Sequence, residues 1–316
     1  DYIGSRGLGD VYKRQDLALA IGTKLADFTT GSWANFENPN FKLVSVNTAR
    51  YDTTKHLATP VISDAKVGLQ KISEALGDWK APDDWYKRAI KEKNEWDAYV
   101  EKQSGPTNQE EPSYAHAVGA VYRNSDPSDI VVTAAGGLVG EVVQVWKPKQ
   151  LNTFETEWGF SCMGYEISGA LGIKMAKPDQ DVVVFVGDGS YLLNNTDIYS
   201  SVIYDQKLII IVCDNGGHMV INRLQLAKGG KEYICNLRAA RATNLKFVDF
   251  ENHAKSMGAN AETVSSTSEL EAAYKRAKDS DKTYVITIKT HGYEWLEGTA
   301  FWESPTLQDP ITDNNK

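Results

Sequence analysis

The chain has 316 residues, of which 34 are Lys or Arg and 42 are Asp or Glu, so its formal net charge at pH 7 is −8. This acidic balance, without any cluster of basic residues, argues against a nucleic-acid partner. Hydrophobic residues make up 41% of the sequence, but the apolar runs are too short to span a membrane, and three cysteines without a CxxC pair support neither a disulfide framework nor a zinc site. We therefore expect a soluble protein of the reducing cytoplasm.

The two ends of the chain are expected to lie outside the folded core. Residues 1–15 show neither a helical or strand period nor a signal-peptide pattern, so we interpret them as a non-native or disordered leader. Residues 304–316 are polar and aperiodic, as in a solvated tail. Because a strand pattern begins directly at residue 16, the sequence is expected to start within a domain and to be a fragment.

Residues 16–78 predict part of a central α/β domain. Strands are expected at 16–22, 42–47 and 60–62. A helix should follow and end at Gly77, because apolar residues at helical spacing precede this glycine: Val67, Leu69, Ile72, Ala75 and Leu76. Residues 79–108 are rich in Trp and in charged side chains, and they predict a linker helix.

Residues 109–303 predict a second α/β domain, in which apolar strands alternate with helices. Strands are expected at 130–133, 181–186, 207–213 and 283–289. Helices are expected at 113–123, 140–146, 164–176, 196–204, 250–257 and 268–278. Strands that are apolar on both faces and separated by helices are typical of a parallel sheet covered on both sides. The predicted fold class is therefore α/β, with a parallel sheet flanked by helices.

Two polar loops follow predicted strands, and their residue types are those of a magnesium site. The first is Gly187-Asp188-Gly189-Ser190 and the second is Asp214-Asn215-Gly216-Gly217. Because ligands of an open α/β sheet bind beyond the carboxyl ends of its strands, we expect these loops to face each other. Asp188 offers an anionic oxygen, Asn215 an amide oxygen and Gly217 a backbone carbonyl, which suit a Mg²⁺ ion that also binds a diphosphate. These three residues are the predicted metal ligands.

The spacing of these loops resembles the signature of thiamine-diphosphate-dependent enzymes. Gly187-Asp188-Gly189 is followed by the 25 residues 190–214 and then by Asn215. One crossover helix needs about this length to reach the neighbouring parallel strand. The resemblance implies thiamine diphosphate and Mg²⁺ as cofactors, and the thiamine-diphosphate-binding fold. The expected cofactor-binding residues in these loops are Asp188, Gly189, Ser190, Asn215, Gly217 and His218.

Two further loops complete the expected cofactor site. In residues 157–166, EWGFSCMGYE, Met163 resembles the large apolar residue that wedges beneath the bent cofactor in this family, although a lone Met is also an ordinary core residue. By the same resemblance, backbone groups of Ser161 and Met163 would hold the aminopyrimidine edge. Residues 134–138 resemble the other diphosphate-binding turn, or are plain turn punctuation after a strand. The cofactor contacts expected there are Gly136, Gly137 and Leu138.

Within this superfamily the chain resembles the trihydroxycyclohexanedione hydrolases of myo-inositol catabolism, over about residues 16–302. The segments that carry this resemblance include DLALAIGTKLADFTTGSW, FSCMGYEISGALGIKMA and CDNGGHMVINRLQ. It implies hydrolytic ring opening of a cyclic 1,2-dione to 5-deoxy-glucuronate, in a homodimer or homotetramer. Family members use a glutamate of an N-terminal pyrimidine-binding domain to activate the cofactor. This chain does not match that domain, so we expect it to be inactive alone.

Other interpretations stay open at this point. The reaction could be that of an acetolactate synthase or a 2-oxo acid decarboxylase, or the chain could be a non-catalytic cofactor-binding module. No catalytic residue is assigned, but His218 could contact the diphosphate or shuttle a proton. Glu157 could face the substrate, and Arg223 an anionic group or solvent. Structural roles are expected for Cys162, as a small buried thiol, and for the remaining histidines: His56, His116, His253 and His291.

Overall fold

The computed structural model describes residues 15–30, 33, 36, 38–157, 159–227, 229–241, 244 and 247–296. The chain divides into two compact units, one of residues 1–99 with 297–316 and the other of residues 100–296. The expected leader, apart from Gln15, and the expected tail lie outside the described residues. Among the described residues, no helix combines the length and the apolar composition needed to cross a membrane.

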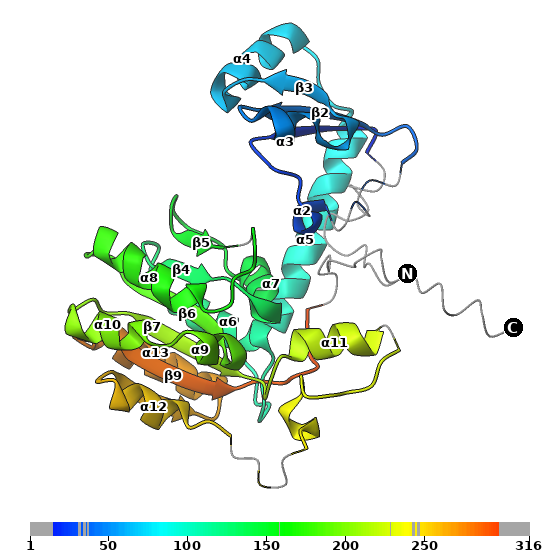
Figure 1. Ribbon diagram of the computed structural model, residues 1–316. Coiled ribbons are helices and arrows are strands. Elements are labelled where there is room, and N and C mark those ends of the chain that lie inside the picture. Colours follow the sequence, from blue (N-terminus) through cyan, green and yellow to red (C-terminus); the bar gives the residue numbers. More distant parts are fainter. Residues whose placement is uncertain are drawn as a thin grey trace, which may run out of the picture. The chain divides into compact units, whose positions relative to one another are not determined.

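The first unit contains a three-stranded parallel sheet in the order β1-β2-β3 (Figure 1). Its strands are β1 (Leu17–Ile21), β2 (Lys42–Asn47) and β3 (Thr59–Ile62), so the three predicted strands are confirmed. Its helices are α2 (Asp27–Thr30), α3 (Arg50–Thr54), the 3₁₀ helix η1 (Lys55–Leu57) and α4 (Ala65–Leu76). The core of this unit is small, and its buried members are Ala20, Leu25, Leu43 and Ala58.

The predicted helix before Gly77 is confirmed as α4. The Asp64 side chain caps its start by accepting the N–H groups of Lys66 and Val67, and Gly77, with φ of 55°, ends it. The apolar stripe of α4 is not buried in this unit, since Val67, Leu69 and Leu76 are 41 to 50% exposed. Helix α5 (Asp83–Gln103) lies within the predicted linker 79–108, and the division between the two units falls inside it.

The second unit is built on six parallel strands in the order β5-β4-β6-β7-β9-β8. The central strands β4 (Ile130–Thr133), β6 (Val182–Gly187), β7 (Ile209–Asp214) and β9 (Tyr284–Lys289) confirm the four predicted strands to within two residues. The edge strands β5 (Phe154–Thr156) and β8 (Asn260–Val264) were not predicted. The expected α/β class with a parallel sheet is therefore confirmed.

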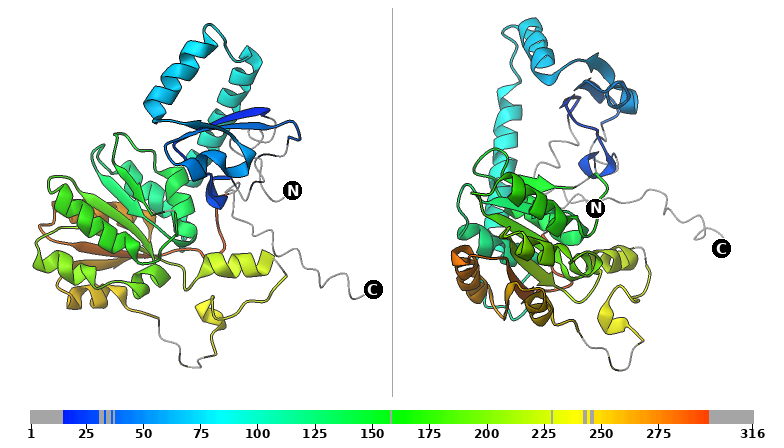
Figure 2. Two further views of the ribbon diagram at one scale, coloured as in Figure 1. Left: turned by 45° about the horizontal axis from the view of Figure 1, so that its top comes forward. Right: turned by 60° about the vertical axis from the view of Figure 1, so that its left-hand side comes forward.

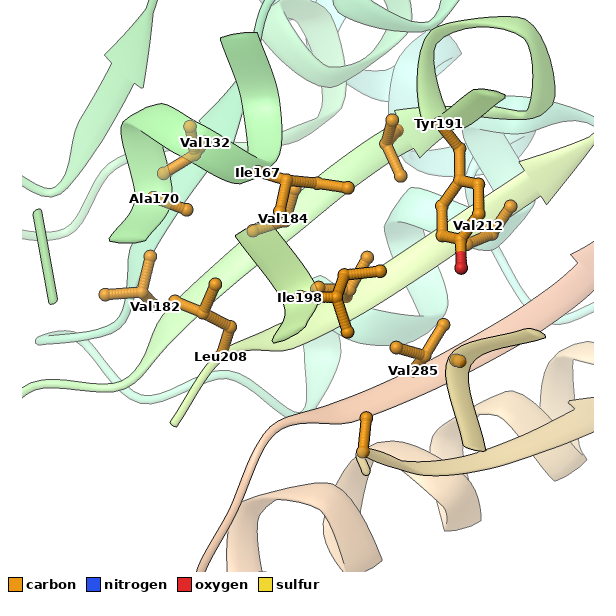
Figure 3. Packing of buried hydrophobic residues seen from close by; sticks show 14 of the residues in the cluster. Val132, Ile167, Ala170, Val182, Val184, Tyr191, Ile198, Leu208, Val212 and Val285 are labelled. Carbon is orange, nitrogen blue, oxygen red and sulfur yellow. The ribbon is translucent and has the colours of Figure 1, made fainter. Parts of the chain in front are cut away.

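Helices cover both faces of this sheet, as the two views of Figure 2 show. One face carries α6 (Tyr114–Arg123), α7 (Gly136–Val145) and α13 (Thr267–Asp279). The other carries α8 (Tyr165–Ala176), α9 (Asp188–Leu193), α10 (Asp197–Ile203) and α12 (Phe250–Ser256). On this second face, Ile167 and Ile198 pack with Val184 and Val212 of the strands (Figure 3). Helix α11 (Met219–Ala227) and the 3₁₀ helix η2 (Leu237–Ala239) follow β7.

The strand order reverses between β4 and β6. From β4 the chain moves outward through α7 to the edge strand β5, and it then returns through α8 to β6 on the other side of β4. The two connecting helices lie on opposite faces of the sheet. In open α/β sheets a ligand binds beyond the carboxyl ends of the strands at such a reversal. The segments that begin at Ala134 and Gly187 therefore flank the expected binding crevice of this unit.

Candidate cofactor and metal site

Asp188 joins the two polar loops that the sequence predicted to meet. It is the first residue of α9, directly after β6, and its side chain is buried. Its Oδ2 atom accepts the backbone N–H of Gly217 at 2.7 Å, so the segments after β6 and β7 are held together. Gly217 has φ of 142°, and a Cβ atom there would lie 2.3 Å from the carbonyl oxygen of Cys235. This close approach requires glycine.

The electrostatics around Asp188 favour a cation. Burial raises the pKa of its carboxyl above the ordinary Asp value, and the nearby charge of Asp214 raises it further. Burial also raises the pKa of Asp214, whose Oδ1 atom accepts the N–H of Gly216 at 3.0 Å. When both are ionised, the neighbouring carboxylates of Asp188 and Asp214 repel each other. A bound divalent cation would remove this repulsion.

Asn215 presents an oxygen of the type that Mg²⁺ binds. Its Nδ2 atom donates to the hydroxyl of Tyr114 at 2.6 Å, and this bond fixes the direction of the amide. Its Oδ1 atom is buried and has no hydrogen-bond partner within the described part of the chain. A buried, unpaired acceptor is costly unless a ligand satisfies it. The donor set of Asp188, Asn215 and Gly217 therefore fits a magnesium ion.

Tyr114 was not recognised from the sequence. It lies on α6 and is fully enclosed, and burial raises the pKa of its hydroxyl well above the ordinary value, so the group stays neutral and accepts from Asn215. Since 101 residues separate the two partners, no local pattern could have joined them. Of the three proposed ligands only Asp188 is an acidic, His or Cys residue. Among the residues that the structure describes, no group of three or more His, Cys, Asp or Glu side chains could hold a metal ion.

Gly189, Met163 and His218 lie close together beside the Asp188 segment. A Cβ atom at Gly189 would lie 2.6 Å from Cε1 of His218 and 3.5 Å from Cε of Met163. Met163 is 37% exposed, so it is not an ordinary core residue. The backbone N–H of His218 donates to the carbonyl of Cys235 at 2.8 Å. The expected cofactor contacts of these three residues stay predictions.

The loop before Met163 is closed by Glu157. Its carboxylate accepts the N–H groups of Phe160 at 2.9 Å and of Cys162 at 2.8 Å, and these bonds lower the pKa of Glu157. Ser161, between them, has φ of 52°, in the left-handed region. Cys162 is exposed, so the prediction of a buried thiol is wrong. The signal was misleading because the apolar neighbours of Cys162 lie on a surface loop, not in a helix or strand.

The segment 134–138 is the start of a helix rather than a loop. Gly136, with φ of 75°, is the first residue of α7. A Cβ atom at Gly137 would lie 2.3 Å from the ring of Trp295, so glycine allows that ring to approach. Leu138 is buried in the core. The atoms of this segment that are left to contact a diphosphate are thus the backbone groups at the first turn of α7. These contacts stay predictions.

The other candidates lie in varied surroundings. The guanidinium of Arg223 lies over the ring of Trp295 at 5.2 Å. His116 forms a capping box with Ser113 at the start of α6, in agreement with the structural role expected for it. His253 is hydrogen-bonded to the hydroxyl of Tyr191 at 2.9 Å. The hydroxyl of Ser190 donates to Glu166, and the expected cofactor contact of Ser190 stays a prediction.

Glu141 is a buried carboxyl group that the sequence reasoning missed. It lies on α7, and its Oε1 atom accepts the N–H of Leu296 at 3.1 Å. Its Oε2 atom is buried without a hydrogen-bond partner among the described residues. Burial raises the pKa of Glu141 to about 7, although the Leu296 N–H and the charge of Arg223 act in the opposite direction. Near neutral pH this carboxyl is therefore expected to be partly protonated.

We predict that Glu141→Gln removes a pH dependence of folding. The pKa in the folded state, about 7, exceeds the ordinary value of 4.5, so the folded state retains a proton that the unfolded state releases. The free energy of unfolding of the wild type should fall as the pH rises through this window, by up to about 3 kcal/mol. Urea unfolding at pH 5 and pH 8 measures the effect. Glu251→Gln is the control, because Lys255 lowers the pKa of that partly exposed carboxyl. Equal pH slopes in wild type and Glu141→Gln would contradict the burial argument.

Comparison with known proteins agrees with this geometry. Residues 134–288 match the family model described as "Thiamine pyrophosphate enzyme, C-terminal TPP binding domain". A Rhodococcus jostii RHA1 thiamine diphosphate-dependent 4-hydroxybenzoylformate decarboxylase has a similar fold, with a TM-score of 0.66 at 15% identity, over 92% of this chain and 51% of the decarboxylase. Residues 134–288 therefore belong to the thiamine pyrophosphate enzymes, and thiamine diphosphate is the cofactor of such a domain.

Within that class the chain is a relative of proteins named 3D-(3,5/4)-trihydroxycyclohexane-1,2-dione hydrolase. It is 31% identical to the protein of Lacticaseibacillus casei over 95% of the chain, and 34% identical to that of Bacillus licheniformis over 90% of the chain. The expected family resemblance is thus confirmed. The chain spans about half the length of the curated relatives that it matches, since it covers 50% of each of these two proteins.

Proposed function

We propose that the chain supplies the thiamine-diphosphate- and Mg²⁺-binding part of a hydrolase that cleaves a C–C bond of 3D-(3,5/4)-trihydroxycyclohexane-1,2-dione. The metal site is proposed chiefly on the buried Oδ1 atom of Asn215, which has no hydrogen-bond partner among the described residues. Two residues later the N–H of Gly217 donates to Asp188. The similarity to the named hydrolases supports the substrate. We further propose a cytoplasmic homodimer or homotetramer as the complete enzyme; the three free cysteines suit a reducing compartment.

The residues of this chain would act by placement and electrostatics. Asp188, Asn215 and the Gly217 carbonyl would hold Mg²⁺, which neutralises a diphosphate group. Thiamine diphosphate, when bound, supplies an electron sink for cleavage beside a carbonyl group. The exposed Met163 side chain, close to Gly189, would support the cofactor. His218 is the candidate for a diphosphate contact or a proton transfer, and we assign no other catalytic residue in this chain.

A calorimetric titration tests the cofactor site. Thiamine diphosphate is titrated into the purified chain with and without Mg²⁺, and heat is expected only with the metal. Absence of heat in both conditions, in this chain and in a full-length relative under the same conditions, would contradict the proposed site.

An activity assay tests the substrate. The chain and a full-length protein that contains it are incubated with the cyclic dione and, separately, with pyruvate. We expect the full-length protein to consume the dione and the chain alone to be inactive. Turnover of pyruvate without turnover of the dione would instead indicate an acetolactate synthase or a decarboxylase.

A further inference from the structure

One buried carboxylate contacts three of the segments that are expected to lie around the cofactor. These segments are residues 134–138, 161–164 and 187–190, and we call them the cofactor loops; the first and the third include the first residues of α7 and α9. The carboxylate belongs to Glu166, in the first turn of α8, and its side chain is 1% exposed. Neither the sequence pattern nor the proposed metal site uses this residue. It is therefore an acidic group whose presence in the core requires an explanation.

Each cofactor loop donates a hydrogen bond to this carboxylate. The N–H of Ala135 donates to Oε1 at 3.3 Å, and the N–H of Gly164 donates to Oε2 at 2.9 Å. The Ser190 hydroxyl lies 2.8 Å from Oε1 and 2.9 Å from Oε2. Ser190 also accepts from the Gly164 N–H at 2.8 Å, so the second and third loops are joined directly. Glu166 thus connects segments that begin after β4, before α8 and after β6.

The sheet itself does not fix the spacing of these loops. The pairing of β4 with β6 ends at Val132 and Val184, whereas the pairing of β6 with β7 continues to Gly187 and Cys213. Beyond Val132 and Val184 the ladder between β4 and β6 does not continue. Glu166 supplies hydrogen bonds across this gap, and its contact with Ala135 lies three residues beyond Val132.

Burial and hydrogen bonding act on Glu166 in opposite directions. Burial raises the pKa of this carboxyl, and the bonds from Ser190, Gly164 and Ala135 lower it. A carboxylate has two acceptor oxygens and no donor, which matches the surrounding N–H and O–H groups. A glutamine of the same shape would direct an NH₂ group at one of these donors. The surrounding hydrogen-bond pattern therefore requires an acid at this position.

We propose that Glu166 is a positioning residue that fixes the mutual spacing of the three cofactor loops, and thereby the affinity for thiamine diphosphate with Mg²⁺. This inference rests on the proposed function, because it requires thiamine diphosphate to bind at the cofactor contacts that are expected in these loops. The hydrogen bonds of Glu166 are to Ala135, Gly164 and Ser190, and none of these three residues is a proposed metal ligand. Residues that orient ligands without touching the bound group change affinity by about 10- to 100-fold when they are replaced.

The test compares Glu166→Gln with Glu269→Gln. Glu269 is a matched control, because it also lies in the first turn of a helix and accepts a backbone N–H and a hydroxyl, both from Ser265 at 2.8 Å, but it belongs to α13, away from the cofactor loops. We expect Glu166→Gln to bind thiamine diphosphate with Mg²⁺ about 10- to 100-fold more weakly than the wild type. Glu269→Gln should bind as the wild type does. Equal affinity in Glu166→Gln and wild type would overturn the inference and leave the proposed function intact.

Amide hydrogen exchange without any cofactor separates this inference from the proposed function. In Glu166→Gln the amides of Ala135 and Gly164 should exchange faster than in the wild type, while the amides of the β6 and β7 strands should not change. Unchanged exchange at Ala135 and Gly164 would overturn the inference whether or not the wild type binds the cofactor. If Glu166→Gln does not fold, Ser190→Ala takes its place: it removes the hydroxyl that both Glu166 and Gly164 contact, and the same two amides should exchange faster.

Discussion

Replacing Asp188 with Asn is expected to abolish the Mg²⁺-dependent binding of thiamine diphosphate without unfolding the chain. The change removes the formal negative charge among the three proposed metal ligands, so the affinity should fall by at least about 100-fold. The fold should tolerate it, because the amide oxygen of Asn can still accept the Gly217 N–H that Asp188 accepts now. It also removes a buried charge beside Asp214. The apo chain should therefore be at least as stable as the wild type.

The measurement pairs calorimetric titration with thermal unfolding. Asp249→Asn is the control, because Asp249 caps α12 through the Asn252 N–H and lies outside the proposed site. That variant should bind the cofactor normally and should lose a little stability, since an ionised acceptor forms the stronger hydrogen bond and interacts favourably with the helix N-terminus. A variant of Asp188 that still binds with Mg²⁺ at wild-type affinity would show that the metal lies elsewhere. A variant that unfolds would show that the carboxylate is structural.

The central strands and the cofactor signature could be predicted because their signals are local. The residues of β6 and β7 are buried on both faces, and a continuous apolar run records this directly. The edge strands were missed for the opposite reason. Strand β5 has three partly exposed or exposed residues, and only Ala261 and Val264 of β8 are buried, so neither strand has an apolar run. The start of α7 was predicted four residues late because Gly136 and Gly137 were interpreted as a loop.

The polar groups that support the site could not be predicted, because their partners are distant in the sequence. Glu166 meets Ala135 across 31 residues, and Tyr114 meets Asn215 across 101. A weak signal was present for Glu166, which is the one acidic residue of a mostly apolar helical segment, YEISGALGIKMA. An acid in such a segment indicates a buried hydrogen-bond partner without identifying it. The proposed metal ligands can thus be recognised from the local sequence, whereas their positioning depends on contacts that only the fold provides.

A buried ion network lies at the edge of the sheet opposite to the proposed site. Asp129 directly precedes β4, and Asp181 directly precedes β6, so both lie at the amino ends of their strands. The ammonium of Lys278 lies 2.9 Å from both carboxylate oxygens of Asp129 and 3.5 Å from Asp181. Asp129 is buried, with a side chain that is 2% exposed, and also accepts from the Tyr274 hydroxyl at 2.8 Å. Lys278 therefore neutralises a charge that the core encloses.

We expect Lys278→Met to lower the free energy of unfolding by about 3 kcal/mol, because it leaves the buried Asp129 carboxylate without its cation. Lys255→Met is the matched control. Lys255 pairs with Glu251 one helical turn away, with side chains that are 48% and 29% exposed, so its loss should cost about 0.5 kcal/mol or less. Urea unfolding at pH 7 measures both values. If the two variants lose the same stability, Asp129 does not depend on Lys278.

This network and the proposed metal ligands lie at opposite ends of the strands. Lys278→Met should therefore bind thiamine diphosphate with Mg²⁺ as the wild type does. A weaker affinity would show that the two edges are coupled.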